Sequence, residues 1–221
     1  MNFYKKYDVY DKNAVIQKKA AEKLLNLSKE YFDKRDFESI YEIGCGTGIF
    51  TRMFLKNFKA EKIILNDIFD VKKFLQDINY TKFILKDMDR ENFPKVFLIV
   101  SSSVFQWSKN FEELVKKISK SCRYLVFSIY LEDNLLEIKK HFDISLNYMT
   151  AEDIEKILKK YFKNIKKESE IFIENFNSPI EVLKHLQNTG VTGFEKTEIK
   201  KIRSFSSVEL TYKVGYFLCE K

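Results

Sequence analysis

Apolar residues recur along the chain with two different spacings, and the spacing distinguishes predicted helices from predicted strands. Near the start, apolar positions follow helical spacing with lysines between them, which predicts an amphipathic helix that contains Ala14, Ile16, Ala20, Ala21, Leu24 and Leu25. Short apolar runs predict strands, and the runs that are apolar throughout are typical of strands buried on both faces. We therefore predict strands at 39–43, 62–66, 82–85, 96–101, 123–130, 168–174 and 208–219, and helices at 50–58, 111–119 and 154–161.

The predicted strands and helices alternate, which indicates βαβ units and a largely parallel sheet in an α/β fold. Because parallel crossovers are right-handed, the loop after the first strand is expected at the carboxyl edge of that sheet. Thr150 and Asp153 have the spacing of a capping box in front of the helix at 154–161. The chain has no internal repeat, low-complexity tract or linker, so its 221 residues are expected to form a single domain, 1–221.

Composition narrows the class of protein. Hydrophobic residues make up 45% of the chain and charged residues 32%, so a packed core is expected rather than a disordered tail. No apolar run approaches the roughly 18–20 residues that a membrane-spanning helix needs, and the first eight residues lack the apolar core of a secretory signal. Three cysteines, far apart and odd in number, argue against disulfides, and only two histidines are present, so we expect a cytoplasmic protein without a metal site.

The net charge of +7 has two interpretations. It could serve an acidic partner, such as nucleic acid, an anionic membrane surface or an acidic protein. It could also be a solvated surface without a specific role. Only five of the 39 basic residues are arginine, the residue best suited to bidentate contacts with phosphate, so we favour the second interpretation and expect no nucleic-acid or membrane partner.

The segment from Glu42 to Gly48, with the sequence EIGCGTG, lies between a predicted strand and a predicted helix and holds three of the six glycines. Glycine lets the backbone turn sharply and approach a ligand closely, and the start of the following helix offers free N–H groups. The spacing is not the dinucleotide fingerprint G-x-G-x-x-G, because Ile49 occupies its third glycine position. A phosphate-binding Walker A loop is also absent, since no Lys-Ser or Lys-Thr follows.

This E-x-G-x-G-x-G turn resembles motif I of class I S-adenosylmethionine-dependent methyltransferases. The resemblance implies S-adenosylmethionine (SAM) as the cofactor. It also implies a Rossmann-like fold: a mostly parallel seven-stranded sheet with an antiparallel C-terminal strand and helices on both faces. Within that fold we expect an N-terminal lid helix at about 10–30, a cofactor half at 38–130, substrate-side elements at 131–205 and a final strand at 208–219.

Two aspartates support a cofactor site. Asp67 ends the second strand, 23 residues after Gly44, where an acidic side chain can accept both hydroxyl groups of a ribose. Asp87 ends the third strand, where the family commonly places an acid that accepts from the adenine amino group. Cys45 has no histidine near it in sequence and is expected to line the turn rather than act as a nucleophile. The cofactor-binding residues that the resemblance implies are Glu42, Gly44, Cys45, Gly46, Gly48, Asp67, Asp87, Met88 and Ser103.

Four further segments resemble malonyl-acyl carrier protein O-methyltransferases. They are Tyr10–Ala20, similar to a Y-D-x-x-A-x-x-Q-x-x-A start; Gln106-Trp107, similar to a Q-W pair; 183–192, similar to an L-x-x-L-K-x-x-G-A block; and 210–217, similar to a closing L-T-Y strand. This resemblance implies substrate contacts at Tyr10, Gln17, Gln106 and Trp107. The chain departs from the family at Gln187, where lysine is usual, at 120–123, which replace a glycine-rich turn, and at 131–136, which are poor in glycine.

The family's activity implies methyl-ester formation on the free carboxylate of a malonyl thioester held by acyl carrier protein, early in biotin synthesis. A carboxylate has a pKa near 4 and is already ionised at neutral pH, so no general base is needed and we name no catalytic residue. His141 and His185 are therefore expected to be structural or on the surface. The carrier is acidic, which makes Lys139, Lys140, Lys159 and Lys160 candidates for contacts with it.

Three alternatives remain open on sequence alone. The acceptor could be another small molecule, such as an organic acid or a quinone precursor. It could be RNA, although the chain has neither an N/D-P-P-Y/F motif nor an appended RNA-binding segment. The chain could also be a cofactor-binding regulatory module that has lost transfer activity.

Overall fold

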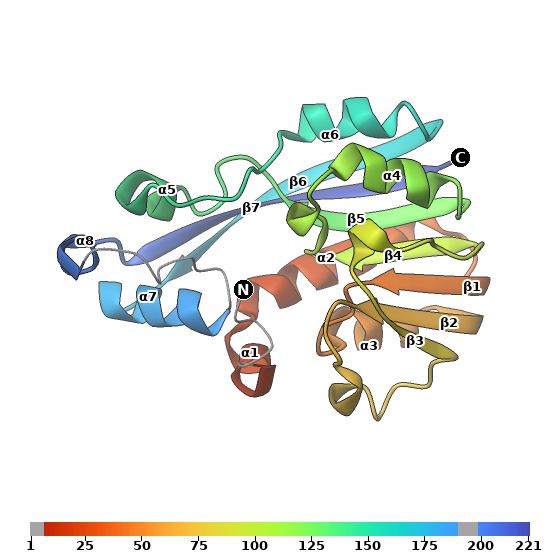
Figure 1. The fold of residues 1–221 in the computed structure, drawn as a ribbon, viewed down its shortest axis with the longest axis horizontal. Helices are drawn as coiled ribbons and strands as arrows, with labels where there is room; N and C mark the ends of the chain where they lie inside the picture. Colours follow the sequence, from red (N-terminus) through yellow and green to blue (C-terminus); the bar gives the residue numbers. More distant parts are fainter. Residues whose placement is uncertain (1–6, 190–198) are drawn as a thin grey trace.

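The computed structural model describes residues 7–189 and 199–221 (Figure 1). One seven-stranded sheet organises these residues, with the strand order β3-β2-β1-β4-β5-β7-β6. The strands are β1 (Asp36–Ile43), β2 (Lys59–Asp67), β3 (Lys82–Leu85), β4 (Leu98–Ser102), β5 (Tyr124–Tyr130), β6 (Asn164–Asn175) and β7 (Glu209–Glu220).

Neighbouring strands pair in parallel up to β5, and β7 then runs antiparallel to both β5 and β6. The predicted mostly parallel sheet with an antiparallel C-terminal strand is therefore confirmed. The strand order reverses at β1, which pairs with β2 on one side and β4 on the other. The loops that leave β1 and β4 diverge at such a switch point, and the crevice between them is where sheets of this kind bind ligands.

Helices cover both faces of the sheet (Figure 1). On one face α2 packs against α3 and against β4, β5 and β7, and on the other face α4 packs against α6. The helices are α1 (Tyr7–Asn13), α2 (Val15–Tyr31), α3 (Ile49–Leu55), α4 (Phe111–Ser119), α5 (Leu136–Phe142), α6 (Ala151–Leu158), α7 (Pro179–Asn188) and α8 (Ile199–Ser204), and short 3-10 turns are η2 (Lys72–Phe74), η3 (Met88–Arg90) and η4 (Phe105–Trp107).

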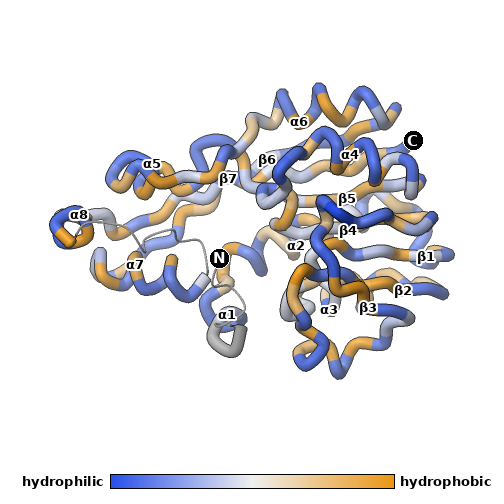
Figure 2. Tube along the Cα trace, viewed as in Figure 1, coloured by the Kyte–Doolittle hydropathy of each residue, from blue (hydrophilic) through white to orange (hydrophobic). Residues whose placement is uncertain are grey.

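Two large apolar cores lie on either side of the sheet. The first joins α2 and α3 to one face of β4, β5 and β7, and it continues under α5 and α7. The second joins α4 and α6 to the other face. The helices show the matching pattern in Figure 2, where hydrophobic and hydrophilic residues succeed each other along their length. Burial of one apolar face, rather than intrinsic helix propensity, holds such short helices in place.

The structure corrects several predicted boundaries. The segment predicted as one helix at about 10–30 forms two, α1 and α2, because Ala14 has a ψ of 49° and turns the chain between them. The predicted strand at 168–174 begins earlier, at Asn164, where Lys166 and Lys167 on the edge strand interrupt the apolar pattern. Helices α5, α7 and α8 were not predicted. Of the 183–192 block, Gly190, Val191 and Thr192 lie outside the described residues.

An aromatic cluster at the amino-terminal edge of the sheet gives a stability prediction. Phe58 is 1% exposed, and its ring centroid lies 4.5 Å from that of Phe54 and 5.6 Å from that of Phe37. We expect Phe58→Ala to lower the free energy of unfolding by about 3–5 kcal/mol in urea, because it leaves a cavity among these rings. Ile199→Ala, at a side chain that is 67% exposed, should change it by less than about 0.5 kcal/mol. Equal effects of the two substitutions would contradict this account of the core.

Candidate active site

A cavity of about 420 Å³ lies at the carboxyl edge of the sheet, where β1 and β4 diverge. Its walls come from the loops after β1, β2, β3 and β4, and from α1 and α2. Of the thirteen residues predicted for the cofactor and the substrate, eleven line this cavity: Tyr10, Gln17, Glu42, Gly44, Cys45, Gly46, Asp67, Asp87, Met88, Ser103 and Trp107. The other two, Gly48 and Gln106, do not line it.

The glycine-rich turn has a conformation that favours glycine at three positions. Gly44, Gly46 and Gly48 have φ values of 70°, 53° and 82°. A Cβ at Gly44 would lie 2.5 Å from a methyl group of Val104, so glycine there lets the loops after β1 and β4 approach each other. A Cβ at Gly46 would meet no atom within 4 Å. Since Gly46 also lines the cavity, the space beside it is open to a ligand.

Gly48 contributes to packing behind the turn, against the segment that follows β2. It is the N-cap of α3, and a Cβ there would lie 2.8 Å from Ile78 and 2.9 Å from Leu75. The small size of Gly48 therefore serves the packing of the loop after β2. This placement does not support the predicted direct contact between Gly48 and a cofactor.

The end of β2 holds the turn in place. The N–H of Cys45 donates to the carbonyl oxygen of Asn66 at 2.9 Å, and the N–H of Gly46 donates to the Asp67 carboxylate at 2.9 Å. Asp67 also accepts from the N–H of Phe69 at 3.0 Å and is only 7% exposed. Burial raises the pKa of Asp67, and the backbone N–H groups that it accepts from oppose this rise. A carboxylate has about four acceptor sites, so Asp67 retains acceptor capacity toward the cavity.

Glu42 is the most strongly perturbed acid of the cavity. It is 3% exposed, and burial raises its pKa to about 8, with the nearby Thr51 hydroxyl opposing the rise and the Asp67 charge adding to it. At neutral pH the carboxyl group of Glu42 is therefore mostly protonated. A cationic group brought next to it would favour the ionised form, so Glu42 can respond to an ammonium-bearing ligand.

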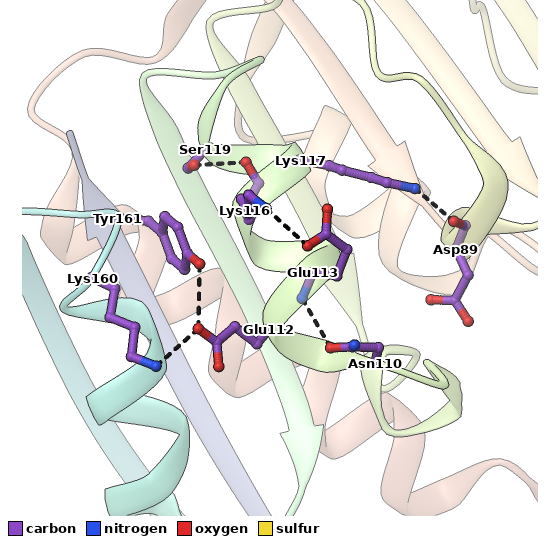
Figure 3. Close-up of polar contacts among 9 residues, drawn as sticks. All are labelled: Asp89, Asn110, Glu112, Glu113, Lys116, Lys117, Ser119, Lys160 and Tyr161. Carbon is purple, nitrogen blue, oxygen red and sulfur yellow. Dashed lines mark hydrogen bonds and ion pairs between the residues drawn. The ribbon is translucent and has the colours of Figure 1, made fainter.

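The wall after β3 is held by hydrogen bonds from α4 and from the two residues that follow η4. Asp87 caps η3 by accepting from the N–H of Asp89, and Met88 is 8% exposed. Asp89 in turn accepts from the Ser108 hydroxyl at 2.6 Å and from the N–H of Lys109 at 2.9 Å. Lys117 of α4 points to this segment and donates to the backbone carbonyl of Asp89 at 2.7 Å (Figure 3).

The predicted substrate residues come from three separate elements. Tyr10 of α1, Gln17 of α2 and Trp107 of η4 all line the cavity. Gln106 is directed elsewhere, because its Nε2 donates to the carbonyl oxygen of Ser103 at 2.6 Å. Gln106 therefore supports the loop after β4, and a direct substrate contact is not evident from its position.

A hydrogen bond that the sequence did not predict fastens α1 over the turn. The Thr47 hydroxyl donates to the Asp11 carboxylate at 2.6 Å, and Arg52 donates to the carbonyl oxygen of Thr47 at 2.6 Å. Arg52 is in turn held by a bidentate pair with Asp77, at 2.7 Å for both bonds. This chain of contacts links α1, the glycine-rich turn and the loop after β2.

Ile68 and Phe69 are among the cavity residues that were not predicted from the sequence. Ile68 lines the cavity and is 55% exposed, which is unusual for a large apolar residue, and Phe69 follows it. They directly follow Asp67, the acid predicted to bind the ribose, and this position in the sequence could have indicated that they line the cofactor site. An exposed apolar side chain beside a carboxylate is suited to cover the flat face of a ring.

The described residues show neither a membrane segment nor a metal centre. Within 7–189 and 199–221, no helix has the length and apolar character to cross a membrane. In the same ranges, no group of three His, Cys, Asp or Glu side chains is placed to hold a metal ion. All three cysteines are free and buried.

Comparison with known proteins places the chain in a family. A methyltransferase-domain family matches residues 13–167. A malonyl-[acyl-carrier protein] O-methyltransferase of Calditerrivibrio nitroreducens is 34% identical over 236 residues, and the match covers 100% of this chain and 95% of the relative. The chain belongs to the malonyl-[acyl-carrier protein] O-methyltransferase family. This methyltransferase resembles the YcgJ protein from Bacillus subtilis in fold, with a TM-score of 0.68, 9% identity, and coverage of 90% of this chain and 98% of that one.

This methyltransferase uses SAM, and its cavity fits that cofactor. Magnesium protoporphyrin IX methyltransferase (ChlM) from Synechocystis PCC 6803, solved with bound SAM, has the same fold with a TM-score of 0.58, 11% identity, and coverage of 92% of this chain and 79% of that one. The fit rests on the open space beside Gly46 and on two buried acids, Glu42 and Asp67, that line the same cavity.

Gly46 gives the first prediction for the methyltransferase site. We expect Gly46→Ala to weaken SAM binding at least about tenfold by calorimetry, because the added methyl group enters the open space and the left-handed backbone disfavours alanine. Gly48→Ala adds its methyl group against Ile78 and Leu75 and should instead lower the melting temperature more than the affinity. Unchanged SAM affinity in Gly46→Ala would show that the cofactor does not approach this turn.

Glu42 gives a prediction about pH. Its folded-state pKa of about 8 lies above the ordinary value of 4.5, so between these values the folded chain binds more protons than the unfolded chain. Stability without cofactor therefore falls as the pH rises from about 4.5, and the full cost is present above about 8. Glu42→Gln should raise the melting temperature by at least about 3 °C at pH 8.5 and change it little at pH 4.5. Glu132→Gln, at an exposed glutamate, should show no such pH dependence, and a pH-independent effect of Glu42→Gln would contradict the shifted pKa.

Proposed function

We propose that this methyltransferase transfers a methyl group from SAM to the free carboxylate of a malonyl thioester on acyl carrier protein, giving a methyl ester for an early step of biotin synthesis. The observation that carries the proposal is the 34% identity to a relative with this name across the whole chain. The predicted motifs support it, since Tyr10, Gln17 and Trp107 line the same cavity as the glycine-rich turn.

In this proposal the nucleoside end of SAM lies on the β2–β3 side of the cavity. Asp67 accepts from the ribose hydroxyls, Asp87 accepts from the adenine amino group, and Met88 and Ile68 contact the ring. Glu42, Cys45 and the backbone of Gly44 and Gly46 face the methionine end. The support is that all these residues line one cavity and that Asp67 keeps free acceptor sites.

The residues of the chain have to bind, align and dehydrate the acceptor. SAM, when bound, supplies a methyl group on a positively charged sulfur. The acceptor carboxylate is already ionised, so no side chain needs to remove a proton. Tyr10 and Trp107 exclude water that would otherwise stabilise the anion, and α1 closes over the site through the Asp11–Thr47 hydrogen bond.

No histidine is placed to act as a base at this cavity. The ring of His141 is hydrogen-bonded to the backbone of Lys201 on the surface, 2.8 Å away. His185 is buried in a different pocket, 3.0 Å from the Tyr212 hydroxyl, and burial lowers its pKa to about 4. Both positions agree with structural roles for the two histidines, and they favour a reaction in which alignment replaces acid–base chemistry.

The candidate carrier contacts divide into two groups. Lys159 pairs with Glu155 at 2.7 Å, and Lys160 pairs with Glu112 at 2.8 Å, where Tyr161 also approaches the same carboxylate (Figure 3). Lys159 is thus paired within the end of α6, whereas Lys160 is paired with α4, and both lysines already have a carboxylate partner. Lys139 and Lys140 are exposed on α5 and remain candidates for an acidic carrier protein. A cytoplasmic location is part of the proposal, supported by the three free cysteines.

The proposed function has a direct test. Purified protein with SAM and malonyl-acyl carrier protein should add the mass of one methyl group to the carrier, and an esterase should remove it. Asp67→Ala should lose this activity at low SAM, because its SAM affinity falls at least about tenfold. Asp70→Ala is a matched control in the same loop, at an exposed carboxylate that faces Lys72, and it should retain activity.

Other acceptors in the same assay decide between the alternatives. If the methyl group is transferred to free malonate or another small acid and not to the carrier, the substrate is a small molecule rather than malonyl-acyl carrier protein. Transfer to RNA, or to none of these acceptors, would overturn the proposal.

A further inference from the structure

Four buried oxygen atoms near the acceptor side of the cavity have no hydrogen-bond partner among the described residues. They are Oε1 of Gln17, Oγ of Ser103, Oε1 of Gln106 and Oη of Tyr130. Gln17 and Ser103 line the cavity, and the Gln106 amide is bonded to the Ser103 carbonyl. Buried polar atoms are nearly always paired in folded proteins, so a group of unpaired ones beside a cavity points to a polar ligand.

Tyr130 is the least explained member of this group. It is the last residue of β5, is 7% exposed and pairs with Val214 of β7. Its ring packs 6.1 Å from that of Tyr212, in the core under α2. Burial raises the pKa of the Tyr130 phenol, the nearby Tyr10 adds to the rise, and the Ser103 hydroxyl opposes it. The phenol therefore stays protonated, and the Ser103 hydroxyl is a side-chain partner within reach of it, although the two do not form a hydrogen bond of normal geometry.

Ser103 is fixed by its backbone rather than by its side chain. Its φ of 59° lies in the left-handed region, which serine adopts at a cost. The N–H of Ser103 donates to both the carbonyl oxygen and the hydroxyl of Ser128, each at 3.0 Å. The backbone is therefore anchored on β5, and the Ser103 hydroxyl lies beside both the cavity and the Tyr130 hydroxyl without a hydrogen bond of normal geometry.

The two hydroxyl groups lie on the opposite side of β1 from the predicted nucleoside contacts. In the strand order β3-β2-β1-β4-β5, Asp87 and Asp67 follow β3 and β2, whereas Ser103 and Tyr130 lie at the ends of β4 and β5. Among the described residues that line the cavity, two are lysines: Lys86, which lies 3.5 Å from Glu91, and Lys109, which follows η4 on the β4 side. The β4–β5 side thus offers the neutral donors of Ser103 and Tyr130, and Lys109 is the one cationic side chain among the described lining residues that follow β4.

We propose that the hydroxyl groups of Ser103 and Tyr130 bind the carboxylate of the acceptor. This rests on the proposed function and names the group that orients the second carboxylate oxygen. One carboxylate oxygen accepts from the two hydroxyls while the other forms a bond to the methyl carbon; the methyl–sulfur bond breaks with its electron pair remaining on sulfur, and both hydroxyls keep their protons. Neutral donors orient the anion without pairing its charge, so the attacking oxygen keeps its electron density.

Access to these donors involves α1. Both oxygen atoms are closed off from solvent, and Tyr10 of α1 lies near Tyr130. Ser103 and Tyr10 line the same cavity, so an acceptor in the cavity approaches the Ser103 hydroxyl beside Tyr10.

The test removes each hydroxyl and compares the result with a matched tyrosine. Tyr130→Phe and Ser103→Gly each remove one donor, and glycine suits the left-handed backbone at position 103. Tyr41→Phe is the control, because Tyr41 is 0% exposed, has an unpartnered hydroxyl and packs against Phe93 on the other face of the sheet. For both test variants we expect the KM for malonyl-acyl carrier protein to rise at least tenfold with SAM affinity within twofold of wild type. Tyr41→Phe should leave both values within twofold.

A carrier without the carboxylate makes the readout specific. Acetyl-acyl carrier protein should inhibit the wild type only weakly, and its inhibition constant should be the same in the test variants, because it lacks the group that the hydroxyls bind. If the wild type methylates the carrier but Tyr130→Phe has the same KM as Tyr41→Phe, this inference is overturned and the proposed function is not. Weaker SAM binding in Ser103→Gly would assign that hydroxyl to the cofactor and also overturn it. Failure of the wild type to methylate the carrier would overturn the proposed function itself.

Discussion

The site depends on two hydrogen bonds by which the end of β2 holds the glycine-rich turn after β1. The carbonyl of Asn66 accepts from Cys45, and the Asp67 carboxylate accepts from Gly46. These bonds fix a backbone with positive φ values at the point where the sheet order reverses. One side chain, Asp67, therefore shapes the turn and also forms the acidic wall of the cavity that the turn encloses.

Further hydrogen bonds connect the rest of the site to this turn. Thr47 within the turn fastens α1 through Asp11, so the element that covers the cavity is bonded to the element that forms its floor. On the far side of β1, Ser128 of β5 holds the strained backbone of Ser103. The sheet order thus separates an acidic side, after β2 and β3, from a side with neutral hydroxyl donors, after β4 and β5. This separation suits a cationic cofactor and an anionic acceptor.

Much of this arrangement could be predicted, because parallel strands bring their carboxyl ends together and Glu42 to Gly48 admit few backbone conformations. Other features could not be read from the local sequence. The Asp11–Thr47 bond joins residues 36 positions apart. The side chain of Gln106 has a local alternative to the substrate contact that its position predicted, since it donates to the backbone of Ser103, three residues earlier. Tyr130 ends a buried strand, where a tyrosine looks like ordinary core. Ser178 and Glu181 have the spacing of a capping box, a local pattern that predicts the start of α7, and the Ser178 side chain accepts from the N–H of Glu181.

A crystal structure of the protein with S-adenosylhomocysteine tests the central claim most directly, since it shows whether the clamped turn is the cofactor site. The account predicts ribose hydroxyls within hydrogen-bond distance of the Asp67 carboxylate and the amino-acid end of the ligand against Gly44 and Gly46. A nucleoside bound outside the cavity, with the turn between β1 and α3 making no contact to it, would contradict the account.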